Sequence, residues 1–176
     1  MSTQKQGGNR KAPATSALSA FEKAAAAAGL TAAAGKSAVD NRYRGLIEGK
    51  TASTRFTGSV DMDAAFKQAE GVANRWDFGL GVHASGRPEC AVWVEPHSAA
   101  STGEVKTMLA KLAWLKAKLG QPEFKSLKTL TDACVDQGRR PYHWLASAHV
   151  AIRPGTREAH MLAARGMDLP KSKVVI

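Results

Sequence analysis

The fold is decided by residues 74–97, which read NRWDFGLGVHASGRPECAVWVEPH. Within residues 76–83, large apolar side chains alternate with other residues, which is typical of a strand with one buried face. A second alternating stretch covers residues 89–95. The five residues between the two stretches, 84–88, include Gly86, which can adopt a positive φ in a turn. We therefore predict an antiparallel hairpin.

The length of this turn decides which residues face each other. With a five-residue turn, Phe78 faces Val94 and Asp77 faces Glu95. Directly opposed residues have Cβ atoms about 4.5–5.5 Å apart, so the two carboxylates would repel each other. A turn that is one residue shorter or longer would move the partner to the other face of the sheet.

The opposed carboxylates form a candidate metal site, with Asp77 and Glu95 as ligands. Hard oxygen ligands suit Mg²⁺ or Mn²⁺. Gly79 and Gly81 carry no side chain, so we expect the surface beside the pair to be open. A metal ion on a basic protein indicates phosphodiester hydrolysis, because the ion lowers the pKa of a bound water. Alternatively, the pair shares a proton, or is neutralised by Arg75 or another base, and has only a structural role.

The order of these residues resembles a known family of nucleases. Asp77 on one strand, Glu95-x-His97 on the next antiparallel strand and a following helix resemble the core of the PD-(D/E)xK nucleases. The resemblance covers about residues 60–119, and it implies a further strand at residues 143–152. It also implies a metal-dependent nuclease activity.

Two more residues take roles from this resemblance. Glu70, on the preceding helix, occupies a position where such nucleases carry another acid. His97 stands where the family has a lysine that orients or activates the attacking water. A neutral histidine can act as a general base, but it lacks the permanent charge of lysine.

Helical and extended patterns continue on both sides of the hairpin. The clearest helix covers residues 103–119, where apolar residues recur at helical spacing after a capping box of Ser101 and Glu104. The other expected strands are 53–60, 142–152 and 173–176, and the other expected helices of this region are 61–75, 123–137 and 156–166. This order predicts an α/β fold of the α+β type, in which helices pack on a mixed, mainly antiparallel sheet.

The N-terminal third has a different composition, and we expect a basic, Ala-rich arm at residues 1–53 before a single domain at 54–176. Residues 1–55 hold nine Lys or Arg against three Asp or Glu, within a net charge of +10 for the whole chain. This excess favours nucleic acid, DNA or RNA, as the partner.

Three parts of the arm are distinguished by their residues. Residues 1–14 are polar and are expected to be disordered. Ser19 and Glu22 fit a capping box at the start of an Ala-rich helix. Because its faces are mostly alanine, this helix should bury little and be loosely attached. Residues 36–53 are expected to be a linker.

Basic side chains near an aromatic residue give a candidate nucleic-acid interface. On the 103–119 helix, Lys111 and Lys118 lie three and four residues from Trp114, so that a base could stack on the indole while the lysines meet phosphates. Alternatively, Trp114 packs beneath the 123–137 helix or the arm. The candidate nucleic-acid-binding residues are Arg75, Lys106, Lys111, Trp114, Lys118, Arg139 and Arg140.

These patterns lead to one hypothesis and two alternatives. The hypothesis is a nucleic-acid-interacting protein that acts as a divergent metal-dependent phosphodiesterase. The alternatives are a protein-interaction module that uses Trp93 and the Gly-rich strand face, and an accessory nucleic-acid-binding module without chemistry. The sequence has no secretory signal and no apolar run of membrane-spanning length, and its two cysteines form no disulfide framework, so we expect a cytoplasmic protein without a membrane partner.

Overall fold

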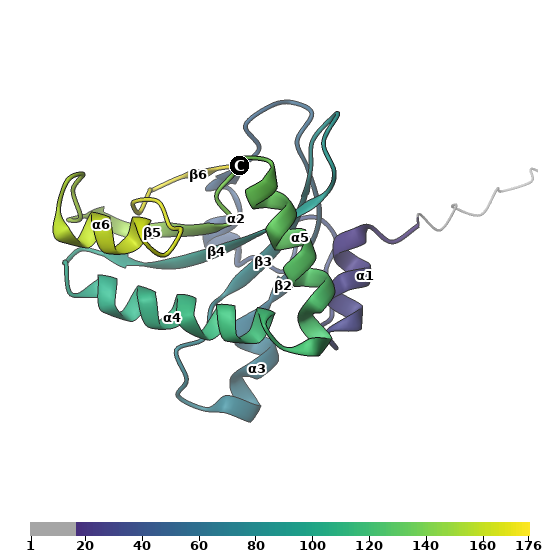
Figure 1. Ribbon diagram of the computed structural model, residues 1–176, viewed down its shortest axis with the longest axis horizontal. Coiled ribbons are helices and arrows are strands. Elements are labelled where there is room, and N and C mark those ends of the chain that lie inside the picture. The colour runs from purple at the N-terminus through teal and green to yellow at the C-terminus, as the bar shows by residue number, and fades with distance from the viewer. Residues whose placement is uncertain (1–16) are drawn as a thin grey trace, which may run out of the picture.

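The computed structural model describes residues 17–176, so the disorder predicted for residues 1–14 lies outside the described part (Figure 1). The strands are β1 (Ile47–Glu48), β2 (Arg55–Asp61), β3 (Phe78–His83), β4 (Cys90–Ala99), β5 (Tyr142–Val150) and β6 (Val174–Val175). The helices are α1 (Ala20–Ala27), α2 (Asn41–Arg44), α3 (Met62–Glu70), α4 (Glu104–Leu119), the 3-10 helix η1 (Pro122–Phe124), α5 (Lys125–Asp136) and α6 (Arg157–Ala163). In the described part, no helix is both long enough and apolar enough to span a bilayer.

The main sheet has four strands in the order β2-β3-β4-β5. The first three strands are antiparallel neighbours, and β5 runs parallel to β4. Parallel neighbours need a long crossover connection, and α4 with α5 provides it. Helices pack on this mixed, mainly antiparallel sheet, so the predicted fold class is confirmed. The short strands β1 and β6 form a separate parallel pair.

The predicted register of the hairpin is confirmed. Phe78 pairs with Val94 and Val82 pairs with Cys90. Gly86 in the turn has a φ of 73°, a conformation that glycine adopts without steric cost. The next position beyond the ladder therefore brings Asp77 opposite Glu95.

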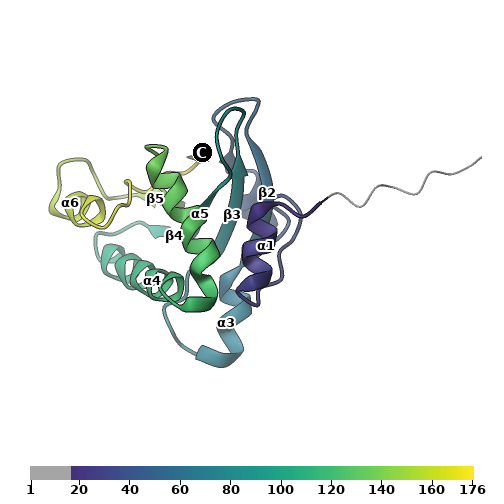
Figure 2. The same cartoon turned by 45° about the vertical axis from the view of Figure 1, so that its right-hand side comes forward.

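Both faces of the hairpin are buried, so the prediction of a half-buried strand is wrong. Five of the six residues of β3 are buried. One face packs with α1, α4 and α5, as the two views of the molecule show (Figure 2). The other face, with Leu80 and Val92, packs against Ile47 and Val174 from β1 and β6.

Gly79 and Gly81 do not leave an open surface, which corrects a second expectation. A Cβ atom on Gly79 would lie 2.6 Å from Trp93 Cζ3, and a Cβ atom on Gly81 would lie 2.6 Å from Phe21 Cγ. The glycines therefore make room for two buried aromatic rings. Trp93 is fully buried and its Nε1 donates to Thr131 Oγ1 at 2.9 Å, so it cannot meet a partner protein on a strand face.

Helix α1 is firmly attached, contrary to the expectation for an Ala-rich helix. Its capping box is confirmed, because Ser19 N donates to Glu22 Oε2 at 2.8 Å and Glu22 N donates to Ser19 Oγ at 3.1 Å. The carboxylate of Glu89 accepts from Ala20 N and Phe21 N at this helix start, where a negative charge is favoured. Phe21 itself is fully buried. Phe21 and Glu22 of this helix lie directly against Gly81 and Gly58 of the sheet.

Residues 36–53 are not a linker, because they cover the other face of the sheet. Val39 and Ile47 are buried there, and β1 pairs with β6. Lys36 Nζ donates to Arg44 O at 2.8 Å and to Ile47 O at 2.6 Å, which closes the segment on itself.

Helix α4 begins at Glu104, close to the predicted start, and its predicted apolar face is buried. The predicted capping box is absent, because the N-cap is Gly103 without a side-chain hydrogen bond. The Glu104 carboxylate contacts His97 instead.

Candidate functional site

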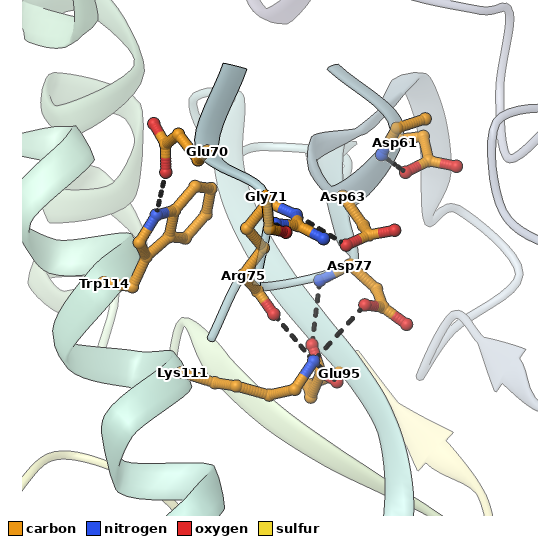
Figure 3. A network of polar contacts seen from close by, with 10 residues as sticks. Asp61, Asp63, Glu70, Gly71, Arg75, Asp77, Glu95, Lys111 and Trp114 are labelled. Carbon is orange, nitrogen blue, oxygen red and sulfur yellow. Dashed lines mark hydrogen bonds and ion pairs between the residues drawn. The ribbon is translucent and has the colours of Figure 1, made fainter. Parts of the chain in front are cut away.

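The two predicted carboxylates meet at the open end of the hairpin (Figure 3). Asp77 directly precedes β3, and Glu95 lies on β4. Glu95 Oε2 accepts a hydrogen bond from Asp77 N at 2.8 Å. The Glu95 side chain is 1% exposed and that of Asp77 is 27% exposed. One carboxylate is therefore enclosed in the protein, and the other reaches its surface.

A lysine from α4 forms ion pairs with both carboxylates. Lys111 Nζ lies 2.6 Å from Glu95 Oε1 and 3.6 Å from Asp77 Oδ1. The same Nζ donates to Arg75 O at 2.6 Å. The sequence predicted Arg75 or another base as a partner for the two carboxylates. In the structure this base is Lys111, and not the side chain of Arg75.

The side chain of Arg75 forms an ion pair with a different acid, Asp63. Its Nε lies 2.8 Å from Asp63 Oδ1, and its guanidinium also donates to Gly71 O. Asp61 caps α3 by accepting from Ala64 N at 2.8 Å. Burial raises the pKa of Asp61, and the negative charge of Asp63 adds to this shift. Arg75 is thus held in the protein and is not free for a nucleic-acid phosphate.

Burial dominates the titration of the carboxylate pair. The pKa of Glu95 is raised to about 8 by burial and, to a smaller extent, by the charge of Asp77, and the charge of Lys111 opposes both effects. The pKa of Asp77 is also raised, mainly by burial, and again Lys111 opposes the shift. A buried and a partly exposed carboxylate that share one ammonium group therefore hold a proton at neutral pH more readily than isolated acids do.

Helix α4 presents a row of polar side chains that are seven residues apart. Glu104, Lys111 and Lys118 lie on one side of the helix because seven residues are close to two turns. Glu104 Oε2 lies 3.0 Å from His97 Nε2, and Lys118 forms an ion pair with Glu70. His97 and Glu70, predicted to join the carboxylate pair, instead contact groups on either side of it.

Trp114 does not form an exposed stacking surface. Its Nε1 donates to Glu70 Oε2 at 2.6 Å, and its ring packs edge-on against Phe66 with centroids 5.7 Å apart. The covering element is therefore α3, rather than the 123–137 helix or the N-terminal arm. Lys118 and Lys111 are both engaged by acids, so the predicted row of Lys111, Trp114 and Lys118 faces the protein.

The remaining predicted basic residues are dispersed. Lys106 is exposed on α4. Arg140 Nε lies 3.0 Å from Asp168 Oδ1 at the surface. Arg139, next to it in the chain, contacts Cys90 Sγ at 3.7 Å and lies near the hairpin turn. These residues do not converge on the carboxylate pair.

The sequence held a signal for Lys111 that the prediction did not use. The seven-residue spacing of Glu104, Lys111 and Lys118 marks one polar row on a helix that otherwise buries apolar residues. Such a row beside a buried stripe indicates charges at the edge of a packing interface. Nothing in the sequence indicated that the acids of this interface are Glu95 and Glu70.

A divalent cation fits the donor set in part. Across residues 17–176, no three His, Cys, Asp or Glu side chains lie close enough together to hold a metal ion. Mg²⁺ keeps several waters, however, and is commonly bound by one or two carboxylates plus substrate phosphates. Glu95 Oε1 lies 2.6 Å from Lys111 Nζ, and in the described part this buried oxygen has no partner beyond that ion pair. Asp77 and Glu95 are thus the residues that could hold such an ion.

Comparisons with known proteins give no further guide to this site. No family model matches the sequence, and neither a curated protein nor a solved structure matches it.

Proposed function

We propose that the protein is a nucleic-acid-interacting phosphodiesterase that uses Mg²⁺ or Mn²⁺. Asp77 and Glu95 would hold the ion, and Lys111 would supply the fixed positive charge that the nuclease resemblance assigns to a lysine. The proposal depends on one observation, which is that the two carboxylates and this ammonium group meet at the end of the hairpin. The net charge of +10 supports an anionic polymer as the substrate.

The residues of the chain have separate roles in this proposal. When bound, the ion would polarise a phosphoryl oxygen and lower the pKa of a bound water. Asp77 offers its partly exposed carboxylate to the solvent side, while Glu95 anchors the site from inside. Lys111 favours the ionised form of Glu95, which metal binding requires. His97 is paired with Glu104, so we give it no proton-transfer role.

Calorimetric titration with Mn²⁺ tests the metal site. At pH 8.5 we expect the wild type to bind one ion, and Asp77→Asn to bind at least tenfold more weakly. Asp77→Asn suits this test because it keeps the size of a partly exposed side chain. Asp132→Asn is the matched control, since Asp132 is an exposed acid of α5 whose only ion pair in the described part is with Lys128. Equal affinity of Asp77→Asn and the wild type would remove the metal site from the proposal.

Cleavage is tested separately with labelled single-stranded and double-stranded DNA and RNA in Mn²⁺. We expect slow nicking by the wild type and by Asp132→Asn, and none by Asp77→Asn or Lys111→Met. Cleavage that persists in Asp77→Asn at the wild-type rate would show that another site or a contaminant is responsible.

One observation favours a second candidate, an accessory nucleic-acid-binding module without chemistry. Lys111 already neutralises the buried carboxylate, which is what a purely structural ion pair requires. This candidate expects salt-dependent binding of nucleic acid that Asp77→Asn leaves unchanged, with no cleavage under any metal. Both candidates keep the cytoplasm as the proposed location, in agreement with the free thiols of Cys90 and Cys134.

A further inference from the structure

A basic hollow lies at the turn end of the hairpin, away from the carboxylates. Its volume is about 380 Å³. Three cationic side chains line it, and hydroxyl groups lie between them; the residues are Lys50, Arg87, Arg139, Thr51, Ser53 and Ser85. Among residues 17–176, no acidic side chain lines the hollow. Its walls therefore offer hydrogen-bond donors and positive charge together.

The cations of this hollow are free of ion pairs within residues 17–176. Lys50 and Arg87 are exposed, and Arg139 is half-buried with a contact to Cys90 Sγ. Ile176 also lines the hollow, and its carbonyl oxygen accepts from Lys50 N at 2.6 Å. Even if the α-carboxylate of Ile176 is counted as an anion, the cations exceed it.

These cations come from three separate segments whose turns are fixed by hydrogen bonds. Arg87 follows Gly86 in the hairpin turn, and Arg139 follows Gly138, which has a φ of 70°. Gln137 Nε2 donates to Pro88 O at 3.1 Å and so ties these two turns together. The third segment, 50–54, is closed by a hydrogen bond from Thr54 N to Thr51 O at 3.0 Å. The positive charges therefore converge without a large rearrangement of the backbone.

We propose that this hollow binds a backbone phosphate of a nucleic-acid strand. Arginine presents a planar fork of donors that matches phosphate oxygens, and serine and threonine hydroxyls add neutral donors. The inference deepens the proposed function, because it rests on nucleic acid as the partner. β3 has six residues, so its length separates the hollow from the carboxylates by about 20 Å. The hollow is thus a binding contact and not part of the proposed catalytic site.

Fluorescence anisotropy with a labelled 12-nucleotide single strand tests this inference, with EDTA present so that no metal chemistry contributes. We expect Arg87→Gln to bind about threefold more weakly, and Arg87→Gln/Arg139→Gln at least tenfold more weakly. The slope of log K against log salt should become shallower by about 0.7 for each lost contact to a single strand. Lys67→Gln/Arg153→Gln removes the same charge from two exposed residues elsewhere and should change the affinity less than twofold.

Two outcomes would overturn the inference. If the Arg87→Gln/Arg139→Gln variant binds the strand as tightly as its control does, the hollow is not the contact. If inorganic phosphate binds to the wild type but the strand does not, the hollow takes free phosphate and not nucleic acid. Since Arg87 is exposed, Arg87→Gln alone gives the answer even if the Arg139 change disturbs folding. Metal binding and cleavage do not enter this assay, so its failure is distinct from failure of the proposed catalytic site.

Discussion

The two ends of the β3–β4 hairpin differ in the sign of their charged side chains and in how far those side chains are buried and paired. At the open end, Asp77 and Glu95 are partly or fully enclosed, and Lys111 pairs with both. At the turn end, Arg87 and Lys50 are exposed and have no acidic partner in the described part of the chain. A single pair of strands therefore has enclosed, paired charges at one end and exposed charges at the other.

This difference shows which charges are available to a ligand. The lysines on α4 were the more attractive nucleic-acid candidates in the sequence, because they flank a tryptophan. In the structure, Lys111 and Lys118 form ion pairs with acids, whereas Arg87 in the turn has no ion pair within residues 17–176. A paired and desolvated cation can position groups in a site, whereas an unpaired cation on the surface can meet phosphates.

The largest effect should come from removing the cation, Lys111, at the open end of the hairpin. Lys111→Met leaves a buried carboxylate without its partner, and breaking a buried pair costs about 3–5 kcal/mol. We expect a loss of about that size in the free energy of unfolding, measured by urea denaturation at pH 9, where Glu95 is ionised in the wild type. Lys106→Met, an exposed change on the same helix, should stay within about 0.5 kcal/mol. A loss below about 1 kcal/mol for Lys111→Met would mean that Glu95 and Lys111 do not form a buried ion pair.

The middle of the hairpin should be sensitive to added volume. Gly81→Ala places a methyl group against Phe21, and overpacking a core costs about 1–3 kcal/mol. Gly45→Ala is the control, because Gly45 has a φ of −74° and no atom within 4 Å of an added Cβ. Thermal unfolding of both variants measures the difference. If Gly81→Ala were as stable as Gly45→Ala, α1 would not lie against the hairpin.

The buried carboxylate of Glu95 should also make stability depend on pH. The native pKa of Glu95, about 8, lies above the ordinary 4.5, so the folded state binds more protons than the unfolded state between these values. The contribution of Glu95 to stability is therefore complete below about pH 4.5 and is lost as the pH rises to about 8, by at most about 1.4 kcal/mol per pH unit. Glu95→Gln should flatten this slope in urea denaturation series from pH 5 to pH 8.5. An unchanged slope would show that another group titrates.

The turn end should show the smallest effect on stability. Arg87 is exposed and unpaired in the described part, so Arg87→Gln should change the free energy of unfolding by less than about 0.5 kcal/mol. The same variant should bind the labelled strand more weakly than the wild type. A large loss of stability would instead assign Arg87 a structural role and weaken the contrast between the two ends.

Local patterns in the sequence predicted the hairpin, its register and the meeting of Asp77 with Glu95. Alternation of apolar residues and a five-residue turn were sufficient, because register depends on short-range geometry. The apolar stripe of α4 and the capping box of α1 were predicted for the same reason. The alternation did not show that both faces of β3 are covered, since Gly79 and Gly81 look polar in a pattern but pack against aromatic rings.

The sequence by itself determined most of the elements and the pair of opposed acids, because a helix or a hairpin with a short turn depends on a continuous stretch of residues. Only the tertiary structure decided that Lys111 pairs with both acids, that Trp114 is covered by α3, and that Arg87 and Arg139 share one hollow. The partners in these contacts do not face each other across one short hairpin turn, so no local pattern records them. Their positions follow from which helix covers which face of the sheet, and that choice is made by the packing of the whole core.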